Sequence, residues 1–227
     1  MRLITSPSFL PEAKAEEVGN VTSFFEKEQP LSLEIGCGIG DFIVQLAARH
    51  PQRNFVVTDI YNQGCLKTCA RVDDAGLTNV RVMRSEARYL MTHLLGAESL
   101  QAIYINCPDP WPKKRHRKRR MVNQEFLQLA FHTLQADGEF HFSTDFVDYG
   151  ISVGELLKAE PGFKNLQSTP YSHDLGDYPV SKYMRRFLEQ GQPIYYCRFL
   201  RRADYKLQTP PAIGRGFRSR WVGRSER

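Results

Sequence analysis

The stretch Leu31-Ser-Leu-Glu-Ile-Gly-Cys-Gly-Ile-Gly-Asp41 decides the fold of this chain. Its first five residues predict a short buried strand, and its glycines predict a tight turn that a helix follows over residues 41–49. Gly36, Gly38 and Gly40 let the backbone approach a ligand closely. Asp41 stands where a dinucleotide-binding turn carries its third glycine. Because an acid there opposes a bound pyrophosphate, the stretch argues against NAD.

Strand-like and helix-like segments alternate through the rest of the chain. Strands are predicted over residues 31–35, 54–58, 80–83, 100–106, 139–143 and 194–200, and helices over 41–49, 63–75, 123–134, 147–158 and 181–190. This alternation predicts an α/β fold with a Rossmann-like, doubly wound, mostly parallel sheet. We expect a polar N-terminal extension over 1–30, in which 12–28 is compatible with a helix. The main domain then covers 31–200, and a basic C-terminal tail covers 201–227.

The net charge of +6 is distributed unevenly. Residues 113–120 contain seven Lys and Arg, and residues 201–227 contribute a further +6, so the remaining residues carry −7. An acidic body with two concentrated basic segments indicates a polyanionic partner. A solvated loop and an unfolded tail are the alternative interpretation. The Asp-Pro-Trp turn beside the first segment favours the polyanion.

Several classes of protein are excluded by what the chain lacks. It has no run of about 18 apolar residues and no apolar signal-peptide region between Met1 and Ala15, so neither a membrane span nor secretion is expected. Its cysteines are Cys37, Cys65, Cys69, Cys107 and Cys197, and their spacing is not that of a metal site. They are expected to be reduced thiols, mostly buried. We therefore expect a cytoplasmic protein without a bound metal.

Polar residues follow the predicted strands. Asp59, Glu86, Asp109 and Asp145 each come just after one, and ligands of such sheets bind beyond the carboxyl ends of the strands. A carboxylate at Asp59 can accept both hydroxyls of a ribose, Glu86 can accept from an adenine amino group, and Glu34 can meet an ammonium group. Adenine, ribose and an amino acid without phosphate describe S-adenosylmethionine. The alternative is a tight turn with solvated acids.

A second candidate site, for chemistry on a flat polar ring, is the turn Pro108-Asp-Pro-Trp-Pro-Lys113. Prolines restrain the backbone, so Asp109 is held in place. Trp111 either stacks on a base or anchors the loop in the core. Lys113 is a candidate contact for a phosphate or for O6 of guanine, and Asp145 is either a further acid of the crevice or a helix cap. Two carboxylates and a lysine match guanine, whose N7 is already nucleophilic and needs alignment more than a base.

These residues resemble the bacterial tRNA (guanine-N7-)-methyltransferases, which use S-adenosylmethionine to methylate a guanine of the tRNA variable loop. The resemblance covers about residues 31–199, and its most specific part is the sequence over 108–120. It implies a seven-stranded class I methyltransferase sheet and a tRNA partner. It places Glu34, Asp59, Glu86 and Asp109 beside the cofactor and makes Asp109 the active-site acid. It implies that Lys113 and Asp145 bind the substrate guanine. It implies that the tRNA is bound by Arg115, His116, Arg117, Lys118, Arg119 and Arg120.

The chain departs from the family pattern at three places. Glu86 replaces the usual aspartate. Ser181 to Met184 replaces Thr-x-x-Glu, so Ser181 supplies the substrate-binding hydroxyl and Met184 supplies no carboxylate. The basic tail matches no part of the pattern, and an added RNA arm or an unfolded end both fit it. Methylation of another RNA base and a non-catalytic tRNA-binding homologue remain the alternatives, as do a monomer and a homodimer.

Overall fold

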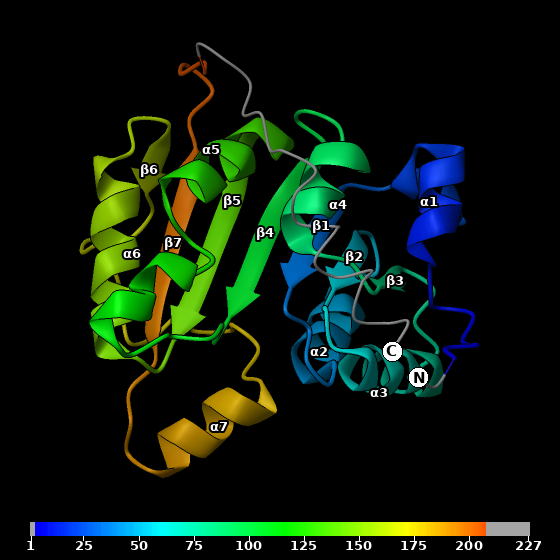
Figure 1. Ribbon diagram of the computed structural model, residues 1–227, viewed down its shortest axis with the longest axis horizontal. Helices are drawn as coiled ribbons and strands as arrows, with labels where there is room; N and C mark the ends of the chain where they lie inside the picture. The colour runs from blue at the N-terminus through cyan, green and yellow to red at the C-terminus, as the bar shows by residue number, and fades with distance from the viewer. Residues whose placement is uncertain (1–2, 208–227) are drawn as a thin grey trace.

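A seven-stranded sheet in the order β3-β2-β1-β4-β5-β7-β6 organises the chain (Figure 1). The computed structural model describes residues 3–207. All neighbours pair in parallel except β7, which runs antiparallel to β5 and β6. This confirms the mostly parallel seven-stranded sheet. The strands are β1 Leu31–Ile35, β2 Asn54–Thr58, β3 Val80–Met83, β4 Leu100–Asn106, β5 Leu134–Thr144, β6 Phe163–Asn165 and β7 Tyr195–Arg201.

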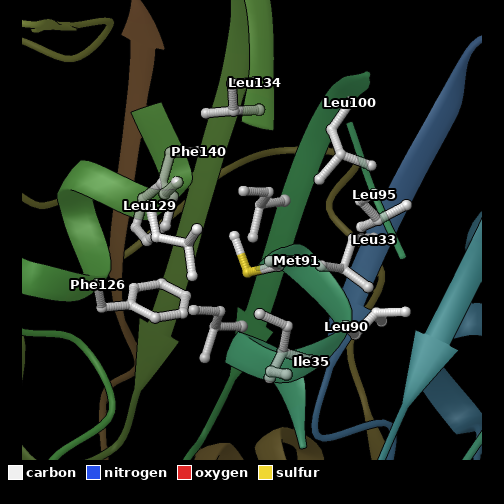
Figure 2. Packing of buried hydrophobic residues seen from close by; sticks show 14 of the residues in the cluster. Leu33, Ile35, Leu90, Met91, Leu95, Leu100, Phe126, Leu129, Leu134 and Phe140 are labelled. Atoms are coloured by element: carbon white, nitrogen blue, oxygen red, sulfur yellow. The ribbon is translucent and has the colours of Figure 1, made fainter. Parts of the chain in front are cut away.

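Helices cover both faces of the sheet. They are α1 Glu12–Val18, α2 Asp41–Arg49, α3 Asn62–Asp74, α4 Ala87–His93, α5 Gln124–Thr133, α6 Val147–Ala159 and α7 Lys182–Glu189, with 3-10 turns η1 Val21–Phe24 and η2 Lys114–Arg119. Successive residues of β4 point to opposite faces. Ile103 and Ile105 join the hydrophobic cluster under α4, α5 and α6, whereas Ala102 and Tyr104 join the cluster under α2 and α3. Figure 2 shows Met91 between β1 and β5 side chains in the first cluster.

The N-terminal residues belong to the same core. Leu10, Ala15 and Val21 are buried in the cluster that α4 and α5 cover. Phe9 pairs with Val82 of β3 in an isolated bridge. A helix throughout 12–28 is not formed, because α1 ends at a left-handed Gly19 with φ of 69°. Side chains from residues 3–30 therefore contribute to the hydrophobic core.

The last described residues also pack on the body. Arg201 ends β7 and is buried, with its guanidinium 2.6 Å from Glu98 Oε1 and 4.4 Å from the centre of the Phe131 ring. Tyr205 meets the same ring edge-on. Arg201 is therefore a structural cation and not part of a basic surface tail. Residues 208–227 of the expected tail lie outside the described residues. Between residues 3 and 207, no helix is long and apolar enough to cross a membrane.

Candidate functional site

A cavity of about 520 Å³ opens at the carboxyl ends of β1, β2 and β4. It lies at the switch point of the sheet, where β1 is flanked by β2 on one side and β4 on the other. Four segments line it: the glycine turn after β1, the end of β2, the loop after β4, and the start of α7. Figure 1 shows α7 below the arrowheads of β4 and β5, at this edge of the sheet.

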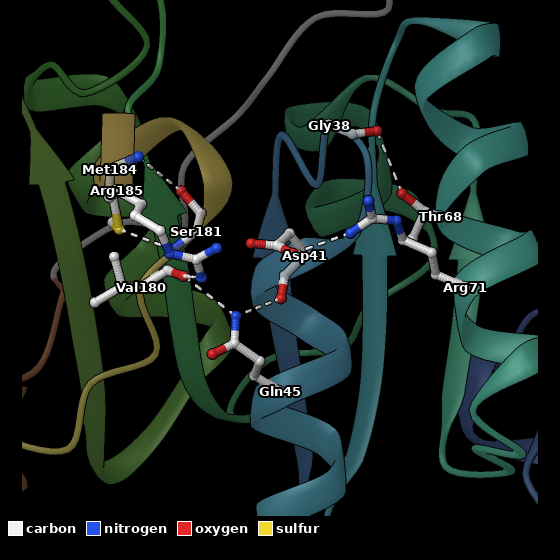
Figure 3. Close-up of polar contacts among 9 residues, drawn as sticks. All are labelled: Gly38, Asp41, Gln45, Thr68, Arg71, Val180, Ser181, Met184 and Arg185. Atoms are coloured by element: carbon white, nitrogen blue, oxygen red, sulfur yellow. Dashed lines mark hydrogen bonds and ion pairs between the residues drawn. The ribbon is translucent and has the colours of Figure 1, made fainter. Parts of the chain in front are cut away.

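The glycine turn is shaped by close contacts with α3. Gly40 has a φ of 79°, and a Cβ there would lie 2.9 Å from Thr68. A Cβ on Gly64 of α3 would lie 2.6 Å from the carbonyl oxygen of Gly38. Thr68 Oγ1 donates to that same oxygen at 3.3 Å (Figure 3). Gly40 and Gly64 therefore let the turn pack closely on α3, and Gly36 and Gly38 line the cavity with no side chain.

Asp59 supports the turn from the end of β2. Its Oδ2 accepts from the backbone N–H of Gly38 at 2.9 Å, and its Oδ1 accepts from that of Tyr61 at 2.8 Å. Each carboxylate oxygen has a further lone pair, so Asp59 can still accept ligand hydroxyls. Asp41 also lines the cavity and pairs with Arg71 at 3.0 Å (Figure 3).

Glu34 forms the buried end of the cavity. It is 2% exposed, and its Oε2 atom has no hydrogen-bond partner among the described residues. Burial raises the pKa of Glu34 to about 8, the Asn106 amide offsets part of the rise, and Asp59 adds to it. A cationic ligand group bound beside Glu34 would favour the ionised form of its carboxyl group.

Glu86 is placed differently from the other predicted cofactor residues. It caps α4, where its Oε2 accepts from the backbone N–H of Tyr89 at 3.1 Å, and Arg88 lies 3.8 Å from its Oε1. Burial raises its pKa. The structure does not bring Glu86 into the wall of the cavity that holds Glu34 and Asp59. An adenine role for Glu86 stays a prediction.

Asp109 and Trp111 both line the cavity, from the loop after β4. Trp111 is half-buried and adopts a left-handed φ of 44°. Its ring meets His116 edge-on at 5.8 Å, and the Arg119 guanidinium lies 4.9 Å from its centre. Trp111 is therefore not an anchor in the hydrophobic core. Its ring forms part of the cavity wall and is contacted by His116 and Arg119 of the basic segment.

Lys113 and Asp145 lie near the site but outside that wall. Lys113 is exposed at the start of η2. Asp145 follows β5 beside Cys107, whose thiol pKa is raised to about 12 by burial and by the Asp145 charge. The helix-cap interpretation of Asp145 is wrong, because α6 has no side-chain cap and Thr144 Oγ1 accepts the backbone N–H of Phe146.

The basic segment has exposed cations at its centre and a buried one at its end. Lys114, Arg115 and Lys118 are exposed. Arg117 is partly exposed and lies 2.8 Å from Asp148.

Arg120 is 6% exposed, and this position corrects its predicted role as an RNA contact. Its Nε donates to the carbonyl oxygen of Pro110 at 2.9 Å, its Nη2 lies 2.6 Å from Asp148, and its guanidinium lies 4.6 Å from the centre of the Tyr149 ring. Arg120 therefore fastens the loop to α6.

The cavity contains residues that the sequence patterns did not single out. Asn106 and the α7 residues Lys182 and Tyr183 line it, and the Tyr183 ring is 59% exposed. Asn106 had a visible signal, because it is the polar residue that ends an apolar strand. In the part of the chain described, no group of three or more His, Cys, Asp or Glu side chains is placed to hold a metal ion. The cysteines there form no disulfide.

Comparison with known proteins identifies the family. The model of a family described as putative methyltransferase matches residues 28–197. A tRNA (guanine-N(7)-)-methyltransferase of Syntrophotalea carbinolica is 51% identical over 220 residues, covering 96% of this chain and 95% of that protein. One of Geobacter metallireducens is 45% identical over 202 residues, covering 88% and 96%. The chain belongs to the tRNA (guanine-N7-)-methyltransferase family.

Solved structures agree on the fold of this tRNA (guanine-N7-)-methyltransferase family member. The 16S rRNA methyltransferase KamB superposes with a TM-score of 0.60 at 16% identity, covering 84% of this chain and 94% of that one. An antibiotic-related methyltransferase superposes with a TM-score of 0.59 at 18% identity, covering 88% and 100%. Both likenesses concern the class I methyltransferase fold alone.

Ser181 and Met184, where the chain departs from the tRNA (guanine-N7-)-methyltransferase pattern, form the N-terminal cap of α7 (Figure 3). Ser181 Oγ accepts from the backbone N–H of Met184 at 3.2 Å, and Met184 Sδ accepts from that of Ser181 at 3.4 Å. This is a capping box in which sulfur replaces a carboxylate. Met184 is fully buried with Ile194 and Tyr196, whereas Ser181 reaches the cavity wall.

Proposed function

We propose that the protein transfers a methyl group from S-adenosylmethionine to N7 of a guanine in tRNA, with a variable-loop guanine as its target. One observation carries the proposal beyond family membership: the loop over residues 108–120 puts Asp109 and Trp111 in the cavity wall and an exposed cationic segment directly beside it. One continuous loop thus carries both the residues that face the base and the cations that bind the RNA backbone.

The cavity fits the cofactor without phosphate recognition. Asp59 is available for ribose hydroxyls, and Glu34, which lines the cavity, is available for an ammonium group. The cavity volume of about 520 Å³ suits a ligand of this size. S-adenosylmethionine supplies an electrophilic methyl group when bound. The protein orients the ligand through Glu34 and Asp59, and the bare glycine turn admits it.

The acceptor needs orientation more than activation. N7 of guanine carries a lone pair and no proton, so no residue has to remove one before attack. Asp109 lines the cavity where the methyl donor and the base meet, and its carboxylate stabilises the positive charge that develops on the base. We assign the guanine N1–H and N2–H₂ donors to Asp145 and the O6 acceptor to Lys113. Ser181 completes this substrate side.

The tRNA backbone meets cations on two sides of the cavity. Lys114, Arg115 and Lys118 are exposed on η2, and Lys182, Arg185 and Arg186 are exposed on α7. Phosphate contacts position a nucleic acid and add strong salt dependence. Light scattering distinguishes a monomer from a homodimer.

Product analysis tests the proposal directly. Unmodified tRNA transcripts are incubated with the protein and S-adenosylmethionine, and their nucleosides are separated by mass spectrometry. We expect 7-methylguanosine at one variable-loop position. A different methylated nucleoside would overturn the N7 assignment, and tRNA binding without any methylated product would indicate a non-catalytic homologue. A transcript with that guanine replaced by adenine serves as the matched control.

A further inference from the structure

Two neighbouring polar atoms at the end of the cavity lack partners. They are Oε2 of Glu34 and Nδ2 of Asn106, and both are buried without a hydrogen bond to any described residue. Leaving such atoms unpaired is costly unless a ligand-bound state pairs them. Both residues line the cavity from the ends of the paired strands β1 and β4, and the Asn106 amide lowers the pKa of Glu34.

The other end of the Asn106 amide is fixed. Its Oδ1 atom accepts from Ser143 Oγ at 2.8 Å and from Tyr178 Oη at 2.8 Å. In this orientation Oδ1 takes both hydroxyls, which leaves Nδ2 as the amide group available to Glu34. Burial raises the pKa of Tyr178 well above its ordinary value, which keeps its hydroxyl protonated as a donor.

The Tyr178 ring is held by aromatic neighbours from four elements. It stacks on His141 of β5 at 5.8 Å, tilts against Phe42 of α2 at 5.1 Å and Tyr104 of β4 at 6.4 Å, and meets Tyr196 of β7 edge-on at 5.5 Å. A ring packed on so many sides gives its hydroxyl a single direction. Nothing assigned to the cofactor site so far explains this arrangement.

We propose that Asn106, oriented by Ser143 and Tyr178, is the hydrogen-bond donor that positions the ionised carboxylate of Glu34 for the ammonium group of the cofactor. Tyr178 is then a positioning residue that acts through Asn106 and never touches the ligand. In the ligand-free protein the pair is unsatisfied. When the ammonium group arrives, Glu34 ionises, and Nδ2 of Asn106 donates to the carboxylate oxygen that faces away from the ligand. This inference rests on the proposed function, because it takes S-adenosylmethionine as the ligand.

The variant Tyr178→Phe tests the proposal, because it removes the hydroxyl and keeps the ring. Tyr196→Phe is the matched control: Tyr196 is buried against Tyr178, and its hydroxyl makes no side-chain hydrogen bond to Asn106. Binding of S-adenosylhomocysteine, which has the ammonium group, is measured by calorimetry between pH 6 and 9. Binding of 5′-methylthioadenosine, which lacks it, is measured alongside. The charged and titratable side chains around Glu34 are Asp59, Cys37 and Tyr178, and burial raises the pKa of Cys37 and of Tyr178 well above their ordinary values.

We expect Tyr178→Phe to weaken S-adenosylhomocysteine binding roughly 3- to 10-fold, the effect of one lost hydrogen bond, and to move the pH midpoint of binding upward. Methylthioadenosine binding should stay unchanged, as should both ligands with Tyr196→Phe. Asn106→Asp, which replaces the donor by a second acceptor, should weaken S-adenosylhomocysteine binding further. Equal losses for both ligands, or equal effects of the two tyrosine variants, would overturn the inference. Failure of the unaltered protein to bind S-adenosylhomocysteine would instead overturn the proposed function.

Discussion

The guanidinium of Arg119 lies 4.9 Å from the centre of the Trp111 ring, so the last exposed cation of η2 covers an aromatic wall of the cavity. A cation held over a ring fixes the plane of that ring. The contact joins the two halves of the loop over 108–120. It makes the basic segment part of the cavity wall as well as a surface for phosphates.

Trp111→Ala should therefore lower kcat/KM for tRNA about 5- to 150-fold, because stacking of one base on an aromatic ring contributes about 1–3 kcal/mol. Arg119→Ala should have a smaller effect of the same kind. Lys118→Ala removes the same charge from an exposed position of η2 and is the control. Steady-state kinetics measure all three. If Lys118→Ala and Arg119→Ala are equivalent, the ring contact has no role beyond charge.

Arg120→Ala should reduce stability and leave the salt dependence of tRNA binding unchanged. The substitution removes the bonds to Pro110 and Asp148, and a lost hydrogen bond to a charged group costs about 1.5–3 kcal/mol. Because the Asp148 side chain is 35% exposed and keeps Arg117 as a partner, we expect the lower end of this range, a fall in Tm of roughly 3–6 °C. Calorimetry measures Tm.

Arg115→Ala is the matched variant, because Arg115 is exposed in the same segment. It should leave Tm unchanged and flatten the plot of log affinity against log salt by about 0.7–0.9 for one phosphate contact. Fluorescence anisotropy at several salt concentrations measures this slope. If Arg120→Ala also flattens the salt dependence of tRNA binding, Arg120 contacts the RNA after all.

Glu34 should make the ligand-free protein less stable as pH rises. Burial raises its pKa from 4.5 to about 8, so the folded state holds a proton that the unfolded state releases. The free energy of unfolding therefore falls between about pH 4.5 and 8. Glu34→Gln should remove this decline.

Glu139 provides an internal comparison in another pH range. Hydrogen bonding to His141, together with Arg198, lowers its pKa to about 2. Its contribution is present above pH 4.5 and is lost as pH falls toward 2, so Glu139→Gln should lower stability at neutral pH, and this difference should shrink in acid. Thermal unfolding followed from pH 3 to 9 separates the two. An unchanged decline in the Glu34→Gln variant would mean that another group causes it.

Met184→Glu, which restores the acid of the family pattern, should make stability fall more steeply with rising pH. The position is fully buried beside Ile194 and Tyr196, so burial should raise the pKa of the introduced carboxyl group. The backbone N–H of Ser181 can still donate to it. The variant should be close to the unaltered protein at pH 5 and have a lower Tm at pH 8. Equal Tm differences at both pH values would show that the side chain escapes to solvent.

Asp109→Ala should abolish methyl transfer while tRNA still binds, because the acid lies in the cavity wall and the phosphate contacts lie elsewhere. Asp109→Asn keeps the shape and removes the charge, and it should lose most of the activity. Single-turnover assays with filter binding separate the two properties. Full activity of Asp109→Asn would show that Asp109 does not act by stabilising the positive charge on the base.

The fold was predictable from the sequence where apolar periodicity and turn residues agree. β1, β2 and α2 begin and end at the predicted residues. α4 was not predicted, because its seven residues span only two turns and start from the side-chain cap of Glu86. β6 has three residues, too few to show a period.

The site was predictable only as a set of residue types. The glycine turn pointed to Glu34, and strand ends pointed to Asp59, Glu86, Asp109 and Asp145. The structure places Glu34, Asp59 and Asp109 in one cavity wall and leaves Glu86 and Asp145 outside it. The sequence could not divide the basic segment, because Arg119 and Arg120 are neighbours with identical side chains. Only tertiary packing turns one toward Trp111 and the other into a buried contact with Asp148.

The loop that carries Asp109 is fastened at both ends. At one end the backbone N–H of Cys107 donates to the carbonyl oxygen of Ser143, and at the other Arg120 binds Pro110 and Asp148. The exposed residues Lys114, Arg115 and Lys118 therefore lie between two fixed points. Evolution can rewrite that span to suit a different RNA, and the reacting geometry stays where it was. Substitutions in this loop can therefore change the affinity for the nucleic acid without changing the chemistry on the base.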